Sequence, residues 1–241
     1  MEKSRWGLSV DIEGFSNLYE HDEDSKTKAI YGLRLLMEAI VNIGTKVYPG
    51  KHETNFSERL FAHQFGDGFV IISDFYEKGP ERCIAIAISL MRHMLMNGYA
   101  LKSAISTGDM SDIHGCYPPT VKDSKNNRVD LGMGLMTTIP VMGTALTKSY
   151  KLLNCKSGNI LIIDSNRFEI LPDVPRNEIY DGIYTIDWVS SELALAKEIS
   201  LNACLEYGRK EDLLKRFEVY IQQKPIPPPK WVNATYLTWQ H

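Results

Sequence analysis

The chain has 241 residues, 44% of them hydrophobic and 24% charged, which is the composition of an ordinary globular domain. Its 27 basic and 30 acidic residues give a net charge of −3, so we expect no overall attraction to nucleic acid or to an anionic membrane. An anionic substrate would need cations or metal ions that are placed locally.

The sequence also lacks the features of an exported or membrane-spanning chain. No N-terminal stretch resembles a signal peptide, and the most apolar helical segment, 83–96, is interrupted by Arg92 and His93. The cysteines form no CxxC pair, so a zinc site is not indicated and reduced thiols are expected. They are Cys83, Cys116, Cys155 and Cys204. We therefore expect a cytoplasmic protein with no membrane or nucleic-acid partner.

The first half of the chain shows strand and helix patterns in turn. Apolar residues alternate over 7–12, and Asp67-Gly68 lies between two strand-like runs, which predicts a hairpin. A long helix that ends near Val47 is expected to bury its recurring apolar residues. These are Ile30, Leu33, Met37 and Ile40, with Leu36 and Ile43 widening the face. The predicted elements are a strand at 7–12, a helix to 47, a loop at 48–58, strands at 59–65 and 69–75, a helix between 79 and 97, and a strand at 101–107.

The second half is less regular. The segment 108–129 is rich in Asp, Ser, Asn, Pro and Gly, which predicts a long loop or flap. The proline run at 225–229 predicts an extended linker, and the aromatic residues after it are expected to dock on the domain or on a partner. Other predicted elements are a helix within 140–153, strands at 160–163 and 180–188, and a helix at 211–222. This order predicts an α+β fold with helices on one face of a sheet, close to a ferredoxin-like arrangement.

The first candidate functional residue is Asp11, at the end of an otherwise buried strand. Burying an unpaired carboxylate there is energetically costly, so we expect a cation close to Asp11. Gly14 permits close backbone approach, and Ser16 is a possible cap for the next helix, whose first amides would face an anion. An Asp at a strand end is also a common turn or cap residue, so both interpretations remain open at this point.

The second candidate, Asp67, stands at the tip of the predicted hairpin. Gly-Asp-Gly is a good turn sequence, so a purely structural role also explains it. Together with Asp11 it gives two carboxylates that end or join central strands and can meet at one edge of the sheet. Magnesium prefers oxygen ligands and takes one or two protein carboxylates together with substrate phosphates. The pair therefore predicts a site for two ions roughly 4 Å apart.

Four segments resemble the class III adenylate and guanylate cyclases, in the same order. The segments 11–16 (Asp-Ile-Glu-Gly-Phe-Ser) and 65–69 (Phe-Gly-Asp-Gly-Phe) look like that family's two metal motifs. The segment 102–108 is similar to its strand that ends in His/Thr-Gly, and 143–152 is similar to its Gly-x-x-Val-Asn-x-Ala-x-Arg-Leu helix. Across residues 5–165, the resemblance implies the class III cyclase fold, with a mostly antiparallel central sheet and flanking helices.

The resemblance also implies a division of the chain and a mode of assembly. A nucleotidyl cyclase catalytic domain would occupy 1–172, and a C-terminal extension with a strand, a helix and a proline-rich tail would complete it at 173–241. The protein would be a homodimer with active sites at the subunit interface. The metal aspartates would come from one chain, and the base-recognition and transition-state residues from the other.

Residue by residue, the resemblance assigns Asp11 and Asp67 as ligands of two Mg²⁺ or Mn²⁺ ions, with the Ile12 carbonyl. Thr147 takes the place of the family's ribose-orienting Asn, and Lys151 that of its transition-state Arg. The implied substrate contacts are the amides of Gly14, Phe15 and Ser16, and the side chains of His63 and Lys102. His63 as a packed strand residue and Lys102 as a solvated surface lysine remain alternatives.

Two positions depart from the family in base recognition. His63 stands where the purine-selecting Lys is found, and Pro140, whose side chain has no donor or acceptor, replaces the selecting Asp. Short cyclases without this pair resemble the pyrimidine cyclases of the Pycsar anti-phage systems. That likeness implies conversion of UTP, or of CTP, to cyclic UMP or cyclic CMP, which a separate effector receives.

Two alternatives remain open. One is an adenylate or guanylate cyclase with atypical base contacts. The other is a non-catalytic, dimeric nucleotide-binding module, which the changes at Thr147 and Lys151 would favour because lysine lacks the planar fork of arginine.

Overall fold

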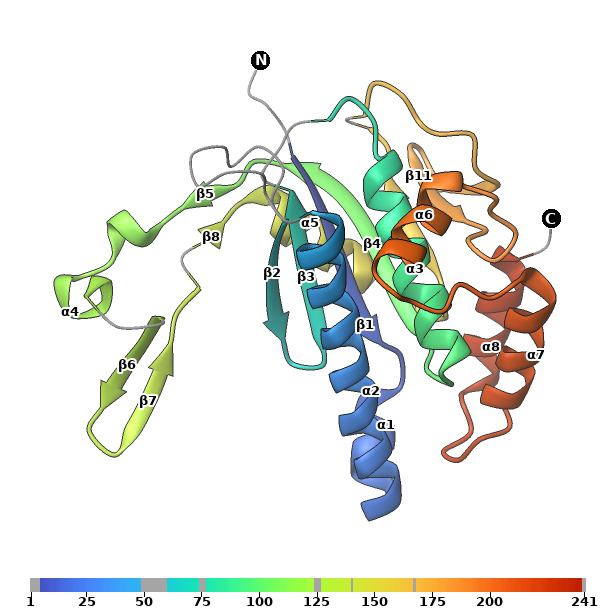
Figure 1. Ribbon diagram of the computed structural model, residues 1–241, viewed down its shortest axis with the longest axis horizontal. Helices are drawn as coiled ribbons and strands as arrows, with labels where there is room; N and C mark the ends of the chain where they lie inside the picture. The colour runs from blue at the N-terminus through green and yellow to red at the C-terminus, as the bar shows by residue number, and fades with distance from the viewer. Residues whose placement is uncertain are drawn as a thin grey trace.

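A computed structural model describes residues 5–48, 60–73, 77–123, 127–139, 141–166 and 168–239. The loop predicted at 48–58 lies almost entirely outside them, and so does Pro140. A seven-stranded sheet forms the centre of the molecule (Figure 1). Its strands in spatial order are β10 (Arg176–Tyr180), β11 (Ile183–Ile186), β9 (Leu161–Asp164), β4 (Leu101–Gly108), β1 (Arg5–Ile12), β3 (Gly68–Ser73) and β2 (Leu60–Phe65). Neighbours are antiparallel except β4 and β9, which run parallel.

Four of the strands form a ferredoxin-like core with the helices between them. Along the chain, β1 is followed by α1 (Phe15–His21) and α2 (Glu23–Asn42), then by the β2–β3 hairpin, α3 (Glu81–Met96) and β4. In space these strands lie in the order β4-β1-β3-β2, which is the arrangement of two interleaved β-α-β units. The predicted α+β fold with a mostly antiparallel sheet and flanking helices is confirmed.

Helices cover both faces of the sheet, which corrects the expectation of helices on one face. Leu8 and Val10 are fully buried against the core that includes α2 and α3. The opposite face of β1 receives α5 (Thr144–Leu153), where the Ser9 hydroxyl donates to Ser149 Oγ at 2.8 Å. A Cβ atom at Gly7 would lie 2.5 Å from the Ala145 carbonyl oxygen. Small residues on this face of β1 therefore let the helix approach closely.

The buried face of α2 differs from the predicted one. Ile30 is 52% exposed and Met37 39% exposed, whereas Leu36 and Ile43 are buried as expected. The contact face is made mainly by small residues: Ala29, Gly32 and Ala39. A Cβ at Gly32 would lie 2.5 Å from the Tyr99 ring. Because small side chains allow the helix to sit close to its neighbours, the larger apolar residues are turned partly outward.

The segment after residue 172 joins the same sheet and core. β10 and β11 extend the sheet beyond β9, and α6 (Ala194–Asn202) and α7 (Lys210–Tyr220) pack on α3 (Figure 1). Every residue of α3 from 83 to 95 is buried as a result. None of the described helices is long and apolar enough to cross a bilayer.

The aromatic residues near the C-terminus dock on the domain, which is one of the two outcomes that the sequence predicted. Trp231 and Tyr236 belong to α8 (Pro229–Thr238), and Trp239 directly follows it. The proline run had obscured this helix because Pro is well suited to the first turn of a helix. Trp231 and Trp239 are 5% and 6% exposed. Their rings lie 5.8 and 4.7 Å from the Phe217 ring of α7, measured between centroids.

Arg92 ties α3 to the C-terminal segment. Its guanidinium lies 4.1 Å from the centre of the Tyr207 ring, and the side chain is only 3% exposed. It donates to the carbonyl oxygens of Trp188, Val189, Ser191 and Gly208.

We expect Arg92→Met to lower the free energy of unfolding by about 3 kcal/mol, because it leaves several buried carbonyls without a donor. Urea unfolding followed by circular dichroism measures the change. Arg34→Met is the control, since Arg34 is exposed and its pair with Glu38 is a surface ion pair. Equal stability of the two variants would remove this role from Arg92.

His93 predicts a pH-dependent contribution to stability. Its ring is 8% exposed, Nδ1 accepts from the Glu206 amide at 3.0 Å, and burial lowers its pKa. Below the ordinary histidine pKa of about 6.5, the unfolded chain therefore binds a proton that the folded chain resists. This contribution is complete above that pH and is lost as the pH falls, by at most about 1.4 kcal/mol per pH unit.

Urea unfolding at pH 7.5 and 5.5 checks this expectation. The loss of stability on acidification should be smaller in His93→Gln than in the natural chain. The exposed His21 provides the control substitution, His21→Gln, which should leave the loss unchanged. An identical loss in His93→Gln and the natural chain would contradict the expectation.

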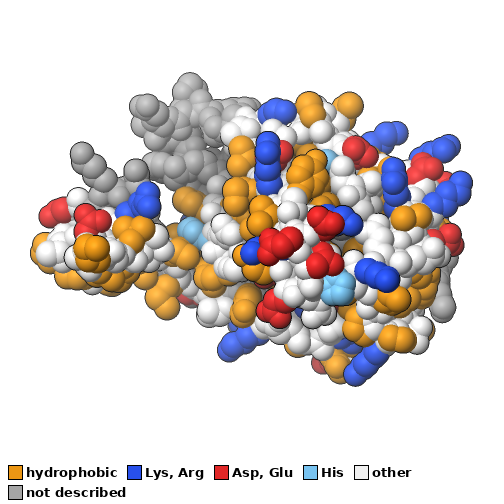
Figure 2. All heavy atoms as spheres, turned by 90° about the horizontal axis from the view of Figure 1, so that it is seen from below, with side chains coloured by type: hydrophobic (Ala, Val, Ile, Leu, Met, Phe, Trp, Pro, Cys, Tyr) orange, Lys and Arg blue, Asp and Glu red, His pale blue; other side chains and the backbone are white. Residues whose placement is uncertain are grey.

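A hairpin that the sequence did not predict projects from the body. The region 108–139 contains short elements as well as loop: β5 (Ser111–Asp112), α4 (Pro119–Lys122), β6 (Arg128–Leu131) and β7 (Gly134–Thr137), with β8 (Val141–Met142) pairing with β5. The β6–β7 hairpin stands clear of the sheet (Figure 1), and hydrophobic side chains gather on this arm (Figure 2). Met133 is fully exposed, and Leu131 and Leu135 are 58% and 47% exposed.

Candidate active site

Asp11 lies on the sheet face that α5 covers. The alternation of β1 places Asp11 on the same face as Ser9, with Val10 and Ile12 on the other. Its direct cross-strand neighbours are Lys102 on β4 and Gly68 on β3. The carboxyl group of Asp11 is therefore flanked by a lysine on one side and by a residue without a side chain on the other.

Asp67 forms the tip of the β2–β3 hairpin. Phe65 pairs with Gly68, which leaves a two-residue loop, and Gly66 has a φ of +63° at its first position. Glycine adopts this left-handed conformation without steric cost, so Gly66 sets the turn and Asp67 follows it. The predicted hairpin and its turn are confirmed.

The structure brings the two carboxylates together. Asp11 and Asp67 both line a small pocket of about 110 Å³ between the sheet and α5. The remaining lining residues are Ser9, Val10, Phe65, Gly68, Phe69, Val70, Tyr150, Leu153 and Asn154. Burial, and next the nearby charge of Asp67, raise the pKa of Asp11 to about 7. Burial also raises the pKa of Asp67. A buried carboxylate whose ionisation is hindered further by a neighbouring carboxylate is typical of a site that binds a cation.

Gly68 leaves space for the Asp11 carboxylate, whereas the sequence alone indicated only a role in the turn for this residue. A Cβ at Gly68 would lie 2.9 Å from Asp11 Oδ1 and 2.7 Å from the Val10 carbonyl oxygen. The backbone of Gly68 is not in the left-handed region, so space and not conformation requires glycine here. The only sequence signal was the second glycine of Gly-Asp-Gly.

Lys102 is buried and paired, which excludes the alternative of a solvated surface lysine. It is 8% exposed, and its Nζ lies 3.5 Å from Glu13 Oε2. Burial raises the pKa of Glu13, and Lys102 together with the Trp231 indole and the Gly158 amide partly offsets that effect. Lys102 also lowers the pKa of both Asp11 and Asp67. The sequence identified Lys102 but not its partner Glu13.

The turn between β1 and α1 begins at Glu13, two residues after Asp11. Gly14 has a φ of +78° and immediately precedes α1, and no side chain caps that helix. Ser16 lies inside α1, so the expectation that it caps the helix is wrong. The Glu13 amide donates to the Ala100 carbonyl at 3.0 Å, and the Tyr220 hydroxyl donates to the Glu13 carbonyl at 3.2 Å. These bonds fix the start of the segment that contains Gly14, Phe15 and Ser16.

Thr147 and Lys151 do not join the carboxylates within one chain. Both are exposed and lie one turn apart on α5. The residues of that helix region that line the pocket of Asp11 and Asp67 are Tyr150, Leu153 and Asn154. A role for Thr147 or Lys151 at these carboxylates therefore requires another copy of the chain.

His63 lies on the sheet face of Asp11, near the edge. It pairs with Val70 of β3, which in turn pairs with Ser9 of β1. Burial lowers its pKa, so the ring is neutral near pH 7. Its buried Nε2 atom has no hydrogen-bond partner among the residues that the structure describes. Such an atom is available to a ligand.

The donors at this site fit a hard divalent cation. In the described ranges there is no group of three or more His, Cys, Asp and Glu side chains that could hold a metal. The carboxylate oxygens available in this pocket are those of Asp11 and Asp67. Magnesium and manganese are held in this way when a substrate and water supply the other ligands. The space that Gly68 leaves beside Asp11 keeps that carboxylate accessible.

Comparisons with known proteins find no sequence relative: no protein-family profile and no curated protein match the chain. The guanylyl cyclase Cya2 has a similar structure, with a TM-score of 0.46 and 10% identity over 76% of this chain and 90% of that one. A class III adenylyl cyclase-like ATP-binding protein from Pseudomonas aeruginosa has a TM-score of 0.43 and 14% identity over 82% of this chain, which spans only 40% of that protein. At such low scores the fold assignment rests on the strand order of this chain.

Proposed function

We propose that the chain is a metal-dependent nucleotidyl cyclase that acts on a pyrimidine nucleoside triphosphate, UTP in preference to CTP. The products would be the 3′,5′-cyclic monophosphate and pyrophosphate. The observation that carries the proposal is the convergence of Asp11 and Asp67, from separate strands, in one pocket. Together with the Ile12 carbonyl, which the resemblance adds, they would form an oxygen donor set suited to Mg²⁺ or Mn²⁺ and a triphosphate.

Each residue of the site has a defined task in this mechanism. Asp11 and Asp67 would hold two Mg²⁺ or Mn²⁺ ions. When bound, such ions would lower the pKa of the ribose 3′-hydroxyl and would neutralise negative charge on the leaving pyrophosphate. Lys102 favours the ionised form of both aspartates, which is the form that binds a cation. The β1–α1 turn at Gly14 presents the backbone of Phe15 and Ser16 to the phosphates.

The chemistry is a single in-line displacement. The 3′-oxygen forms a bond to the α-phosphorus, the bond from that phosphorus to the bridging oxygen breaks, and the hydroxyl proton passes to water. Positioning and charge stabilisation account for most of the rate enhancement in reactions of this type.

A homodimer would complete the site. Thr147 and Lys151 are exposed and lie outside the carboxylate pocket of their own chain, so a second copy would bring them to the substrate. Thr147 would then orient the ribose, and Lys151 would stabilise charge on the phosphate. The apolar β6–β7 arm offers further contact area between the two copies.

The proposed preference for a pyrimidine rests on the resemblance, in which His63 and Pro140 stand in place of the purine-selecting Lys and Asp. The unpartnered ring nitrogen of His63 can hydrogen-bond a base edge, and Lys102, the other side-chain candidate for substrate contact, is engaged by Glu13. The resemblance to the Pycsar cyclases further suggests that the cyclic product is a second messenger in anti-phage defence, received by a separate effector.

Purified protein incubated separately with UTP, CTP, ATP and GTP in the presence of Mn²⁺ tests the proposal, with products identified by mass spectrometry. We expect a cyclic pyrimidine nucleotide, no product after EDTA treatment, and recovery when Mn²⁺ is restored. A cyclic purine would overturn the base assignment and favour an atypical adenylate or guanylate cyclase. Nucleotide binding without any product would favour the non-catalytic module, which the position of Thr147 and Lys151 outside the pocket supports.

A further inference from the structure

A second and much larger cavity lies beside the β1–α1 turn, beneath the C-terminal segment. Its volume is about 800 Å³, within the usual range of small-molecule sites of about 300–1,000 Å³. Its walls come from segments far apart in the chain: the turn at 12–14 with α1, the residues 97–100 after α3, the residues 154–157 after α5, and the segment 220–234. Asp11 and Asp67 do not line it, but Asn154 lines both this cavity and the carboxylate pocket, so the two adjoin one another.

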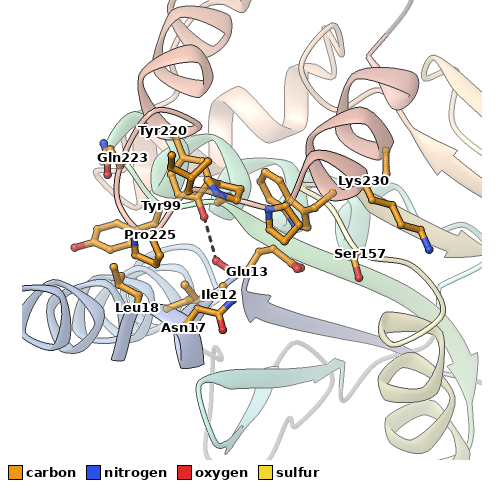
Figure 3. Close-up of a pocket in the computed structure, with 18 of the residues that line it drawn as sticks. Ile12, Glu13, Asn17, Leu18, Tyr99, Ser157, Tyr220, Gln223, Pro225 and Lys230 are labelled. Carbon is orange, nitrogen blue, oxygen red and sulfur yellow. Dashed lines mark hydrogen bonds between the residues drawn. The ribbon is translucent and has the colours of Figure 1, made fainter. Parts of the chain in front are cut away.

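The two ends of this cavity differ in chemistry. Leu18, Tyr99 and Pro225 lie toward one end, and Ser157 and Lys230 lie toward the other, with Glu13 between them (Figure 3). The first end offers apolar and aromatic surface on which a ring can stack. The second end offers hydroxyl and ammonium donors.

The charge of the lining favours an anion. Four lysines line the cavity, and none of them has an ion pair with any residue in the described part of the chain: Lys28, Lys156, Lys224 and Lys230. Glu13 is the only acidic residue among the described lining residues, and Lys102 already pairs with it. The cavity therefore carries an excess of positive charge next to an apolar surface.

The position of the cavity links it to the carboxylates. Ile12, Glu13 and Gly14 form part of its wall, and Ile12 directly follows Asp11 in β1. The Tyr220 hydroxyl, on the C-terminal side of the cavity, donates a hydrogen bond to the Glu13 carbonyl (Figure 3). A ligand that fixes these groups also fixes the turn that follows Asp11.

We propose that this cavity binds a small organic anion that carries an aromatic ring, and that its occupation is coupled to metal binding at Asp11 and Asp67. The ring lies at the end formed by Leu18, Tyr99 and Pro225, and the anionic group lies near Lys230 and Ser157. Coupling between two sites is reciprocal, so bound metal also changes the affinity for this ligand. The binding itself does not depend on the proposed cyclase activity.

Fluorescence titration with 1-anilinonaphthalene-8-sulfonate, an aromatic sulfonate, tests the site. We expect saturable binding to the folded natural protein with one molecule per chain. Ala234→Phe, which places a ring in the cavity, should weaken binding at least about tenfold. Asn233→Phe is the matched control because Asn233 is exposed on the same helix and does not line the cavity. No saturable binding, or equal binding by both variants, would overturn the proposal.

A charge-reversal pair keeps the test decisive if Ala234→Phe disturbs α8. Lys156→Glu with Lys230→Glu should weaken dye binding at least about tenfold at low salt. Lys197→Glu with Lys215→Glu changes the net charge equally, but at exposed positions away from the cavity. Equal affinity in the two double variants would overturn the anionic character of the ligand.

Dye titrations with and without Mn²⁺ test the coupling. We expect the dye affinity of the natural protein to change by about fivefold or more, and no change in a variant that combines Asp11→Asn with Asp67→Asn. An unchanged affinity in the natural protein would overturn the coupling. Competitive displacement of the dye by UTP in that double variant would show that the cavity is part of the substrate site and would overturn a separate ligand. These readouts involve no turnover, so their failure is distinguishable from failure of the proposed function.

Discussion

Asp67→Asn is expected to reduce the rate of cyclic nucleotide formation by at least about a hundredfold while leaving the fold and the assembly of the chain intact. The substitution keeps the shape of the side chain but removes a charge that a divalent cation requires. Asp67 is half-buried in the two-residue turn of the hairpin, outside the paired positions of β2 and β3, so the strand pairing does not depend on its carboxylate. Initial rates with UTP and Mn²⁺ measure the effect, and light scattering checks the assembly.

Asp181→Asn provides a closely matched control for that experiment. Asp181 likewise lies in the two-residue turn of an antiparallel hairpin, between β10 and β11, and is followed by a glycine in the sequence, but it lies outside the carboxylate pocket. Its substitution should leave the rate unchanged. Full activity of Asp67→Asn would remove Asp67 from the metal site.

Gly68→Ala is expected to be nearly as damaging, although it alters no charge. The added methyl group would lie 2.9 Å from Asp11 Oδ1 and 2.7 Å from the Val10 carbonyl, so the carboxylate or the strand must shift. A displacement of about 1 Å in a catalytic group can reduce the rate about a hundredfold. Overpacking should also lower the free energy of unfolding by about 1–3 kcal/mol. Cyclisation rates and Mn²⁺ affinity, measured together, report the displacement.

Gly115→Ala is the control for the added methyl group. Gly115 is exposed, and a Cβ there would meet no atom within 4 Å. It should therefore behave as the natural chain does. A folded Gly68→Ala protein with natural activity and Mn²⁺ affinity would show that the Asp11 carboxylate does not need the space that glycine leaves.

The central strands were predictable because their signals are local. Alternating apolar residues in β1, and a glycine-containing turn between β2 and β3, require no knowledge of distant segments. The buried face of α2 was not predictable in this way. Its contacts depend on Gly32 fitting against Tyr99, which follows 67 residues later in the chain and in space lies beside it. Hydrophobicity alone therefore selected the wrong residues, Ile30 and Met37.

The candidate site was predictable only in part, for a similar reason. Asp11 and Asp67 stood out because each is a charged residue beside a buried strand. Glu13 and Gly68 gain their meaning from cross-strand register, which places one near Lys102 and the other against Asp11. Part of the wall of the large cavity comes from α8, a helix that was not predicted because the run of prolines at its start indicated a linker.

Binding of Mn²⁺ in the absence of nucleotide, followed by the loss of the free-ion signal in electron paramagnetic resonance, tests the paired carboxylates most directly. The natural chain should bind Mn²⁺ saturably, and the variant with both Asp11→Asn and Asp67→Asn should leave the ion free in solution. If that double variant bound Mn²⁺ with the stoichiometry and affinity of the natural chain, the two aspartates would not form a metal site.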